Sequence, residues 1–460
     1  MHGIEEVVAR DMCIGCGVCE IATRRAITVR LSPRGIYEAD LSRADREALL
    51  IGSAVCPFSD AATNEDELGK SRFGEHGLQK IDGLGLVRHA AIGRRTSESE
   101  LIGSSSGGLT SWLAETLLER GEVDEVVHVA PDVNDGGLFA YTSSGDTATV
   151  EARRKSQYYA TTMAGVLGRI RESQDVRFAL IGVPCYIKSA QLLAKRDPRL
   201  DGKIRYYVGL VCGHMKTRAF AEALAWQSGI RPDELAGVDF RVKNPGRSSA
   251  DYDVTSWATD GRREVRRTRD LLGGNWGHGA FQPEACNFCD DIFAETADVV
   301  FGDAWLPEFN DDWRGHNVVI VREPRILDLF RQGTESGQIV LREIEPGVAR
   351  ATQAGAFRHR VDGLRVRLSD DLSRGLSVPR KRVSPATRHV SRRRRRLIRY
   401  RRQMSRLSIE AFANARATGE LDLFMAEMRT AIAVYQRMET PAWRRYAGRA
   451  RRLIRAWLRH

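Results

Sequence analysis

Two stretches in the middle of the chain repeat one order of apolar and polar positions. Residues 176–195, VRFALIGVPCYIKSAQLLAK, begin as a short apolar run, turn at Gly-Val-Pro and continue with the apolar spacing of a helix. Residues 203–227 follow the same order. A buried strand followed by an amphipathic helix, twice in succession, predicts right-handed βαβ connections. We therefore expect an α/β body built on a parallel or mixed sheet.

The same patterning predicts elements on both sides of this body. Residues 26–41 alternate around a Pro-Arg-Gly turn and predict a hairpin, and residues 42–57 predict a helix that ends near Cys56. Residues 102–121 predict a helix after a Ser/Gly loop, followed by a strand over 123–130. At the other end, residues 440–460 predict a helix that begins at Pro441, with an apolar stripe among arginines.

Composition places the chain among ordinary globular proteins, because 42% of its residues are hydrophobic and 28% are charged. No apolar run is long enough for a membrane-spanning helix, and acidic residues occupy the start where a secretory signal would be basic and apolar. We expect a cytoplasmic protein. Cysteines stay reduced in that compartment, so the eight cysteines favour metal binding or redox chemistry over disulfides.

Three cysteines stand close together near the start of the chain. Cys13, Cys16 and Cys19 follow the spacing C-x2-C-x2-C, and Cys56 is followed by a proline. This combination is typical of the bacterial ferredoxin site for a 4Fe–4S cluster. A zinc site usually shows two C-x2-C pairs instead. We interpret these four residues as the ligands of one cluster.

The other four cysteines are scattered along the chain. Cys185 and Cys212 each follow a predicted strand of the body, and Cys286 and Cys289 form a C-x2-C pair further on. The carboxyl ends of parallel strands share one edge of a sheet, where ligand sites form. A second site of four thiolates is therefore plausible. Its spacing fits either an iron–sulfur cluster or zinc, and Cys185 and Cys212 could also be buried inert thiols.

The loop before the helix of residues 102–121 has a composition that suits an anionic ligand. Three serines and two glycines stand in a row there: Ser104, Ser105, Ser106, Gly107 and Gly108. Glycines allow close approach to the backbone, and a helix N-terminus favours negative charge. A plain helix cap is the alternative, because serine is a common N-cap residue.

The order of these motifs resembles the beta-subunit family of coenzyme F-420 hydrogenases and dehydrogenases, which also includes 7-hydroxymethyl chlorophyll a reductase. The resemblance covers roughly residues 10–325 and rests on CIGCGVC with the later CP, SSSGGLTSWL, IGVPCYI, LVCGH and CNFCDDIFAETADVVFGDAW. It implies an FAD enzyme with one or two 4Fe–4S clusters. It also implies that Ser104 to Gly108 lie at the flavin and that the four later cysteines bind the second cluster. Asp303 matches a recurring acidic residue of the family.

Taken with the resemblance, the sequence predicts an iron–sulfur flavoprotein oxidoreductase that passes electrons between a hydride carrier and its clusters or a partner. Coenzyme F-420 is a candidate co-substrate, although the sequence does not show its use. The alternative is an electron-transfer subunit that serves a partner enzyme. We expect a ferredoxin-like module over 1–66, a flavin-associated part over 85–165, the part with the second cysteine set over 166–350, and a basic helical extension over 377–460.

The extension is the source of the positive net charge of the chain. Residues 377–460 hold 23 Lys and Arg against 5 Asp and Glu, whereas the remainder of the chain has a net charge of −7. Three roles are possible for this extension. It could form a helical cap on the enzyme, or it could contact an anionic membrane surface or an acidic partner. Binding of nucleic acid is the least favoured role. Within the body, residues 240–247 contain Arg241, Lys243 and Arg247. This pattern favours a solvated strand end over a contact with a polyanionic coenzyme.

Overall fold

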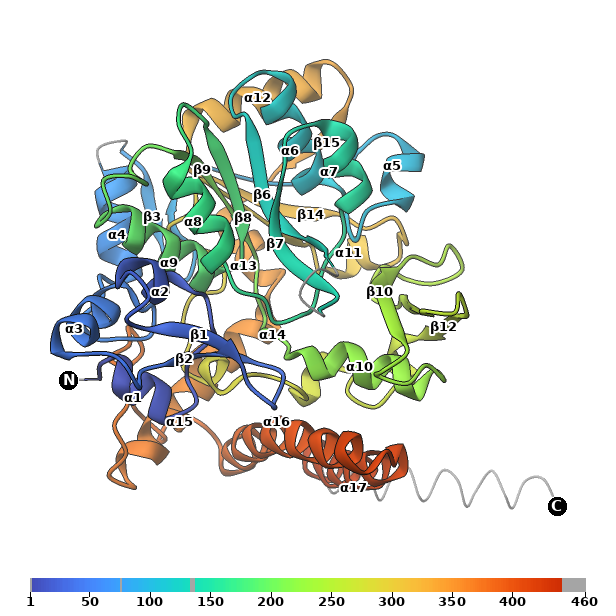
Figure 1. The fold of residues 1–460 in the computed structure, drawn as a ribbon. Helices are drawn as coiled ribbons and strands as arrows, with labels where there is room; N and C mark the ends of the chain where they lie inside the picture. The colour runs from blue at the N-terminus through green and yellow to red at the C-terminus, as the bar shows by residue number, and fades with distance from the viewer. Residues whose placement is uncertain (1, 75–76, 133–136, 441–460) are drawn as a thin grey trace.

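The computed structural model describes residues 2–74, 77–132 and 137–440, and an eight-stranded sheet lies at its centre (Figure 1). The strand order is β15-β5-β14-β13-β9-β8-β6-β7. Strands β13, β9, β8 and β6 run parallel, and antiparallel pairs complete both sides. The expected α/β class is confirmed, and the sheet is mixed. Its strands are β5 (His89–Arg95), β6 (Glu125–Pro131), β7 (Phe139–Ser144), β8 (Phe178–Gly182), β9 (Ile204–Leu210), β13 (Val299–Asp303), β14 (Asn317–Val321) and β15 (Ile339–Glu343).

The repeated strand–helix pattern folds as predicted. Strand β8 is followed by α9 (Pro184–Ala194), and the parallel strand β9 is followed by α10 (Arg218–Gln227). Pro184 occupies the first turn of α9, where its missing N–H costs no helical hydrogen bond. Both connections leave the sheet at the same edge.

Helices cover both faces of the sheet. On one face, Val299 and Phe301 pack with α6 (Leu109–Glu119) and α12 (Pro324–Glu335). On the other face, Val300 belongs to a larger core that includes α8 (Ala164–Glu172) and α9. Side chains that alternate along β13 therefore fill two cores, as expected for a strand buried on both faces.

The N-terminal segment packs directly onto the second core. It consists of α1 (Ile4–Ala9), α2 (Val18–Ala22), the hairpin β1 (Thr28–Leu31) and β2 (Tyr37–Asp40), and α3 (Arg46–Val55). The Met163 amide donates to the carbonyl of Cys16 at 3.0 Å. Gly17 has φ +87°, and a Cβ there would stand 2.6 Å from the Ala164 nitrogen. Only glycine allows this approach.

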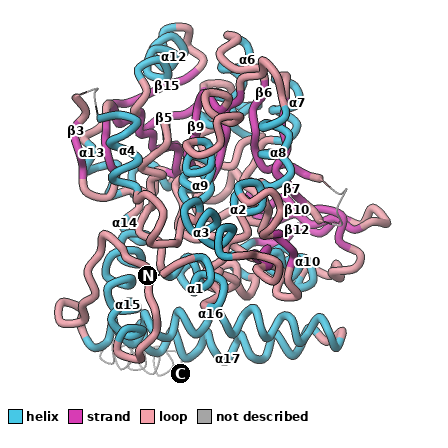
Figure 2. Tube along the Cα trace, turned by 60° about the vertical axis from the view of Figure 1, so that its left-hand side comes forward, coloured by secondary structure: helices cyan, strands magenta, loops and turns pink. Residues whose placement is uncertain are grey.

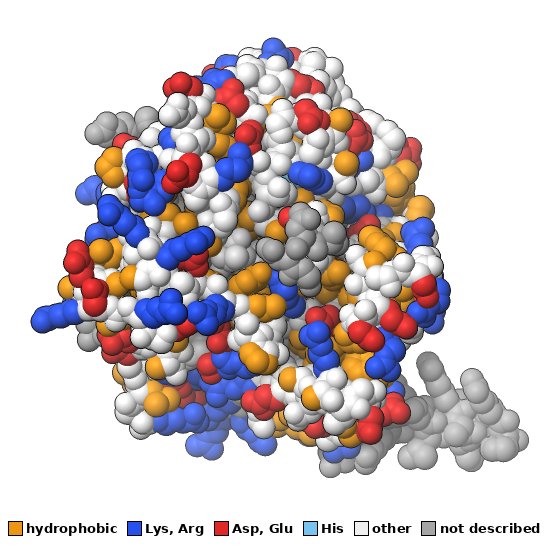
Figure 3. All heavy atoms as spheres, in the orientation of Figure 1, with side chains coloured by type: hydrophobic (Ala, Val, Ile, Leu, Met, Phe, Trp, Pro, Cys, Tyr) orange, Lys and Arg blue, Asp and Glu red, His pale blue; other side chains and the backbone are white. Residues whose placement is uncertain are grey.

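Two long helices close the C-terminal side of the body. Figures 1 and 2 show α16 (Arg392–Thr418) and α17 (Leu421–Glu439) side by side. Phe412 of α16 packs edge-on against Phe281 and Trp226, so the pair belongs to the core. Figure 3 shows Lys and Arg side chains gathered at the lower edge of the molecule, near the start of α16. The helix predicted over 440–460 lies almost entirely outside the described residues.

Short elements complete the described chain. They are α4 (Glu65–Phe73), β3 (Gln79–Ile81), β4 (Gly85–Val87), α5 (Glu98–Ile102), α7 (Thr147–Arg153), β10 (Leu235–Val242), β11 (Asp253–Ala258), β12 (Arg263–Arg267), the 3-10 helices Thr268–Asp270, Trp276–His278 and Glu284–Asn287, α11 (Pro307–Asn310), α13 (Pro346–Ala351), α14 (Ala354–Phe357), the π-helix Arg358–Gly363 and α15 (Leu364–Leu372). Within the described ranges, no helix combines the length and apolar character needed to cross a bilayer.

Candidate functional site

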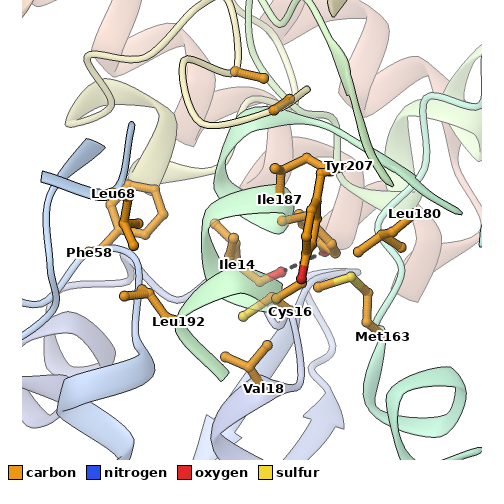
Figure 4. Close-up of a cluster of buried hydrophobic side chains, with 14 of the residues drawn as sticks. Ile14, Cys16, Val18, Phe58, Leu68, Met163, Leu180, Ile187, Leu192 and Tyr207 are labelled. Carbon is orange, nitrogen blue, oxygen red and sulfur yellow. Dashed lines mark hydrogen bonds between the residues drawn. The ribbon is translucent and has the colours of Figure 1, made fainter. Parts of the chain in front are cut away.

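The four N-terminal cysteines gather in one buried place. Burial and then the charges of Cys16, Cys13 and Cys56 raise the pKa of the Cys19 thiol, so these sulfurs are electrostatic neighbours. Helix α3 ends where Cys56 follows it, as the sequence pattern predicts. Figure 4 shows Cys16 among hydrophobic side chains. The sequence spacing and the fold thus bring four thiols together.

Backbone geometry fixes the loop that carries these thiols. Gly15 has φ +62°, and a Cβ there would stand 2.1 Å from the Cβ of Tyr37. The amides of Gly15 and Ala39 both donate to the Cys13 sulfur, each at 3.4 Å. Hydrogen bonds to sulfur are one of the ways in which a protein sets the potential of an iron–sulfur cluster.

The second set of cysteines also converges in space. Burial and then the charges of Cys289, Cys212 and Cys286 raise the pKa of the Cys185 thiol. Cys185 stands in the first turn of α9, and Cys212 follows β9, at the shared edge of the sheet. The Met215 amide donates to the Cys286 sulfur at 3.3 Å. The four residues predicted from the sequence therefore lie in one neighbourhood.

An aromatic pair lies close to both sets. The rings of Tyr141 and Tyr186 stack with centroids 5.6 Å apart. Burial and then the charges of Cys185 and Cys16, one residue from each set, raise the pKa of Tyr141. The Tyr186 hydroxyl lies 2.6 Å from the carbonyl oxygen of Thr161 and 3.2 Å from that of Ile14, which holds α9 beside the first cysteine loop. Sequence reasoning did not identify this pair.

Arg360 is a second residue that the motifs did not reveal. It is 1% exposed and donates to the carbonyls of Cys212 and Gly213 at 3.2 and 2.9 Å. The charges of the second cysteine set raise its pKa against the lowering effect of burial. A guanidinium is thus held beside four thiols. Nothing in the spacing around residue 360 indicated this.

All eight cysteines are free thiols. In the part of the chain that the structure describes, no three His, Cys, Asp or Glu side chains surround a point that would hold a single metal ion. A 4Fe–4S cluster takes four thiolates around a larger body. Two groups of four thiols, buried or half-buried, with N–H donors to sulfur and a nearby guanidinium, suit such a cluster chemically.

A cavity of about 940 Å³ extends from the Ser/Gly loop to Cys212 of the second cysteine set. Ser104, Ser105, Ser106 and Gly108 line one part of it, and the stretch 212–216 lines another. The volume lies within the range of small-molecule and cofactor sites. Gly107 does not line the cavity, because it packs against the backbone of β5 and β14. The loop and Cys212 therefore face one shared space.

The loop is held rigidly by its neighbours. The Lys243 ammonium donates to the carbonyls of Leu101, Ser106 and Arg314 at 2.6 to 2.8 Å. The Leu109 amide, at the start of α6, donates to the side chain of Asn317 at 3.0 Å. This helix N-terminus is thus partly satisfied within the protein.

The expectation of a solvated strand end at residues 240–247 is wrong for its first half. Arg241 is 4% exposed and lines the cavity. It makes a bidentate ion pair with Asp303, at 2.8 and 3.1 Å. The strand end is covered because Arg241 pairs with Asp303 at the end of β13 and Lys243 donates to the carbonyl of Arg314, in the loop before β14. Asp303, which had no assigned role, is the partner of this arginine.

Several buried polar atoms on the cavity wall lack a hydrogen-bond partner among the described residues. They are Arg154 Nη1, Gln157 Oε1, His214 Nε2, Arg241 Nε and His359 Nε2. A buried polar atom without a partner costs about 1–3 kcal/mol. A bound polar ligand would offset that cost.

Comparison with known proteins is consistent with the motif order. Two family profiles describe the N-terminal and the C-terminal parts of the beta subunit of coenzyme F420 hydrogenase/dehydrogenase. The N-terminal profile matches residues 91–168, and the C-terminal profile matches residues 175–347. One subunit of the F(420)H(2) dehydrogenase of Methanosarcina mazei is 27% identical over 218 residues, which are 45% of this chain and 55% of that protein.

The chain therefore spans about half the length of this curated relative. A chain of the F420-reducing nickel–iron hydrogenase complex from Methanosarcina barkeri aligns with a TM-score of 0.47 and 14% identity, over 65% of this chain and 98% of that one. The two profiles together cover more than half of the 460 residues. The chain belongs to the coenzyme F420 hydrogenase/dehydrogenase beta-subunit family.

Proposed function

We propose that this protein is an oxidoreductase that binds FAD in the 940 Å³ cavity and holds two 4Fe–4S clusters. Its N-terminal segment would act as a ferredoxin-like module for the first cluster. The single observation that carries the proposal is the shared cavity: the Ser/Gly loop and Cys212 line the same space. A cofactor held by the loop would thereby reach the second cysteine set.

The residues divide into three groups by what they would hold. Cys13, Cys16, Cys19 and Cys56 would bind the first cluster, and Cys185, Cys212, Cys286 and Cys289 the second. Ser104 to Gly108 would lie along the flavin. When bound, a flavin takes up a hydride as two electrons and releases them singly, and a cluster carries one electron at a time. The Tyr141–Tyr186 stack lies near a cysteine of each set.

The electron donor would be a hydride carrier, with coenzyme F-420 as the first candidate. The relative from Methanosarcina mazei belongs to a dehydrogenase whose name includes the reduced form of this coenzyme. That relative is one subunit of its enzyme, which favours a second candidate function. In this alternative the protein is an electron-transfer subunit that serves a partner enzyme and has no substrate of its own.

One experiment separates the two functions. The protein is purified anaerobically, and reduced coenzyme F-420 or NAD(P)H is added without any other protein. Bleaching of the flavin band within seconds supports an enzyme with its own substrate. A flavin that stays oxidised until a partner protein is added supports the electron-transfer role. A sample without flavin contradicts both.

A further inference from the structure

The cavity has a basic end that the cofactor assignment leaves unexplained. Its lining includes His214, Lys216, His359, Arg394 and Arg401. These groups are neighbours, because the charge of Arg401 lowers the pKa of His214, Lys216 and His359, after the larger effect of burial. Only two carboxylates among the described residues line the whole cavity, Asp303 and Glu439, and Asp303 is paired with Arg241. Among the described residues, the basic end therefore holds Lys216, Arg394 and Arg401 against the single carboxylate of Glu439.

His359 presents a hydrogen-bond donor to this space. Its Nδ1 lies against the guanidinium groups of Arg367, at 3.3 Å, and Arg401. A guanidinium only donates, so Nδ1 accepts and the proton of the neutral ring must sit on Nε2. Burial and the surrounding arginines lower the pKa of His359 well below its usual value, which keeps the ring neutral. His359 is 8% exposed, and its Nε2 has no partner among the described residues.

Helix α16 supplies the charges around that donor. Arg401 is fixed by bonds from its guanidinium to the carbonyls of Gly277, at 2.9 Å, and Trp276, at 3.3 Å. Arg394, two turns earlier, lines the cavity, and no carboxylate of the described residues forms an ion pair with it. Burial is the main cause that lowers the pKa of Arg401 to about 10, and the charge of Arg394 contributes to this lowering, so these two cations repel each other.

The position of α16 is well defined. Arg402 forms ion pairs with Glu284 and Asp371, and the far end of the helix is buried in the core with Phe412. Figure 2 shows α16 lying against α17 along one side of the body. The family profiles end at residue 347, so His359, Arg394 and Arg401 come from the part of the chain that they do not cover.

From this arrangement we infer that the basic end of the cavity binds the anionic group, a carboxylate or a phosphate, of the substrate. Arg394 is the ion-pair partner, the His359 Nε2–H is the hydrogen-bond donor, and Arg401 is the positioning residue that fixes the His359 tautomer. The inference rests on the proposed function only in placing the substrate in the same cavity as the flavin.

The test measures anion binding in the full-length protein as purified. Millimolar inorganic phosphate, or acetate in a parallel series, is compared with chloride at equal ionic strength, and the thermal unfolding midpoint is followed. A ligand that binds the folded state raises this midpoint in a saturable way. Arg394→Gln should weaken the response by about tenfold, the amount expected for loss of a charge-assisted contact.

Arg396→Gln is the matched control, because Arg396 lies on the same helix but is exposed and does not line the cavity. It should respond like the wild type. Equal responses in the two variants, or no response of the wild type to either anion, would overturn the inference. A response to one anion alone identifies the group as phosphate or carboxylate.

Removal of the flavin distinguishes the substrate from the cofactor. The titration is repeated after flavin extraction, and the same anion affinity is expected. Binding that appears only in the flavin-free protein would assign the basic end to the phosphates of the cofactor and would overturn the substrate assignment. Flavin and iron are measured in the same sample. Their absence would contradict the proposed function, while the anion titration would still decide this inference.

Discussion

The Arg360 guanidinium donates from Nη2 to the carbonyl oxygen of Cys212 at 3.2 Å and stands 4.0 Å from the sulfur of the same residue. The contact places a buried positive charge beside the second cysteine set. A 4Fe–4S cluster bound by four thiolates is an anion that gains a further negative charge on reduction. A nearby cation therefore favours the reduced form and raises the reduction potential.

Replacing Arg360 should lower the potential of the second cluster. If the lost charge is worth about 1.4 kcal/mol, Arg360→Gln shifts that potential by about −60 mV, since a one-electron couple changes by about 59 mV for each 1.4 kcal/mol. Arg360→Lys, which keeps the charge, should shift it less. An EPR-monitored redox titration measures both. The exposed Arg374→Gln is the control, and an equal shift in that variant would exclude the local charge as the cause.

The Arg241–Asp303 pair should be important for stability. Asp303→Asn leaves a guanidinium that is 4% exposed without its carboxylate partner. Removing one partner of a buried pair costs about 3 kcal/mol or more. Urea unfolding should show this loss, whereas the exposed Asp311→Asn should be close to neutral. Similar values for both variants would show that the pair contributes little.

Lys243 should produce a pH dependence of stability. Burial lowers the pKa of Lys243 to about 7, whereas the unfolded chain holds a lysine near about 10.4. Between these values the unfolded state binds more protons, so the free energy of unfolding rises with pH. Lys243→Met removes this rise. We expect the free energy of unfolding of the wild type, relative to that of the variant, to rise from about pH 7 to about pH 9.

The exposed Lys195→Met is the matched control for that measurement. Its stability should remain parallel to that of the wild type at every pH. Parallel curves for Lys243→Met as well would mean that the ammonium stays charged in the folded protein, held by the three carbonyls around it.

The elements that local patterning determines could be predicted from the sequence. The order strand, Cys185, helix and strand, Cys212, helix gave two parallel strands and placed both cysteines at one edge, because connection handedness leaves few arrangements. The spacing of Cys13, Cys16 and Cys19 likewise requires a tight loop, and the glycines between them supply its positive φ angles.

Contacts between distant segments could not be predicted. Arg360 and His359 lie in a π-helix with no motif, and their positions near residues 212 and 401 depend on how three separate segments pack. The expectation of a solvated strand end around Arg241 was wrong for the same reason, because Asp303, the partner of Arg241, is 62 positions away in the sequence. Composition indicates that the C-terminal region is basic, but it does not show that Arg402 pairs with Glu284 inside the molecule.

Metal analysis of the protein purified anaerobically, together with EPR of the dithionite-reduced sample, tests the central claim most directly. Two clusters predict about eight iron per chain, and Cys212→Ser and Cys16→Ser should each fall to about four, with the signal of the other cluster retained. About four iron and one zinc in the wild type, with the zinc lost in Cys212→Ser, would contradict the second cluster and leave a single iron–sulfur module beside the cavity.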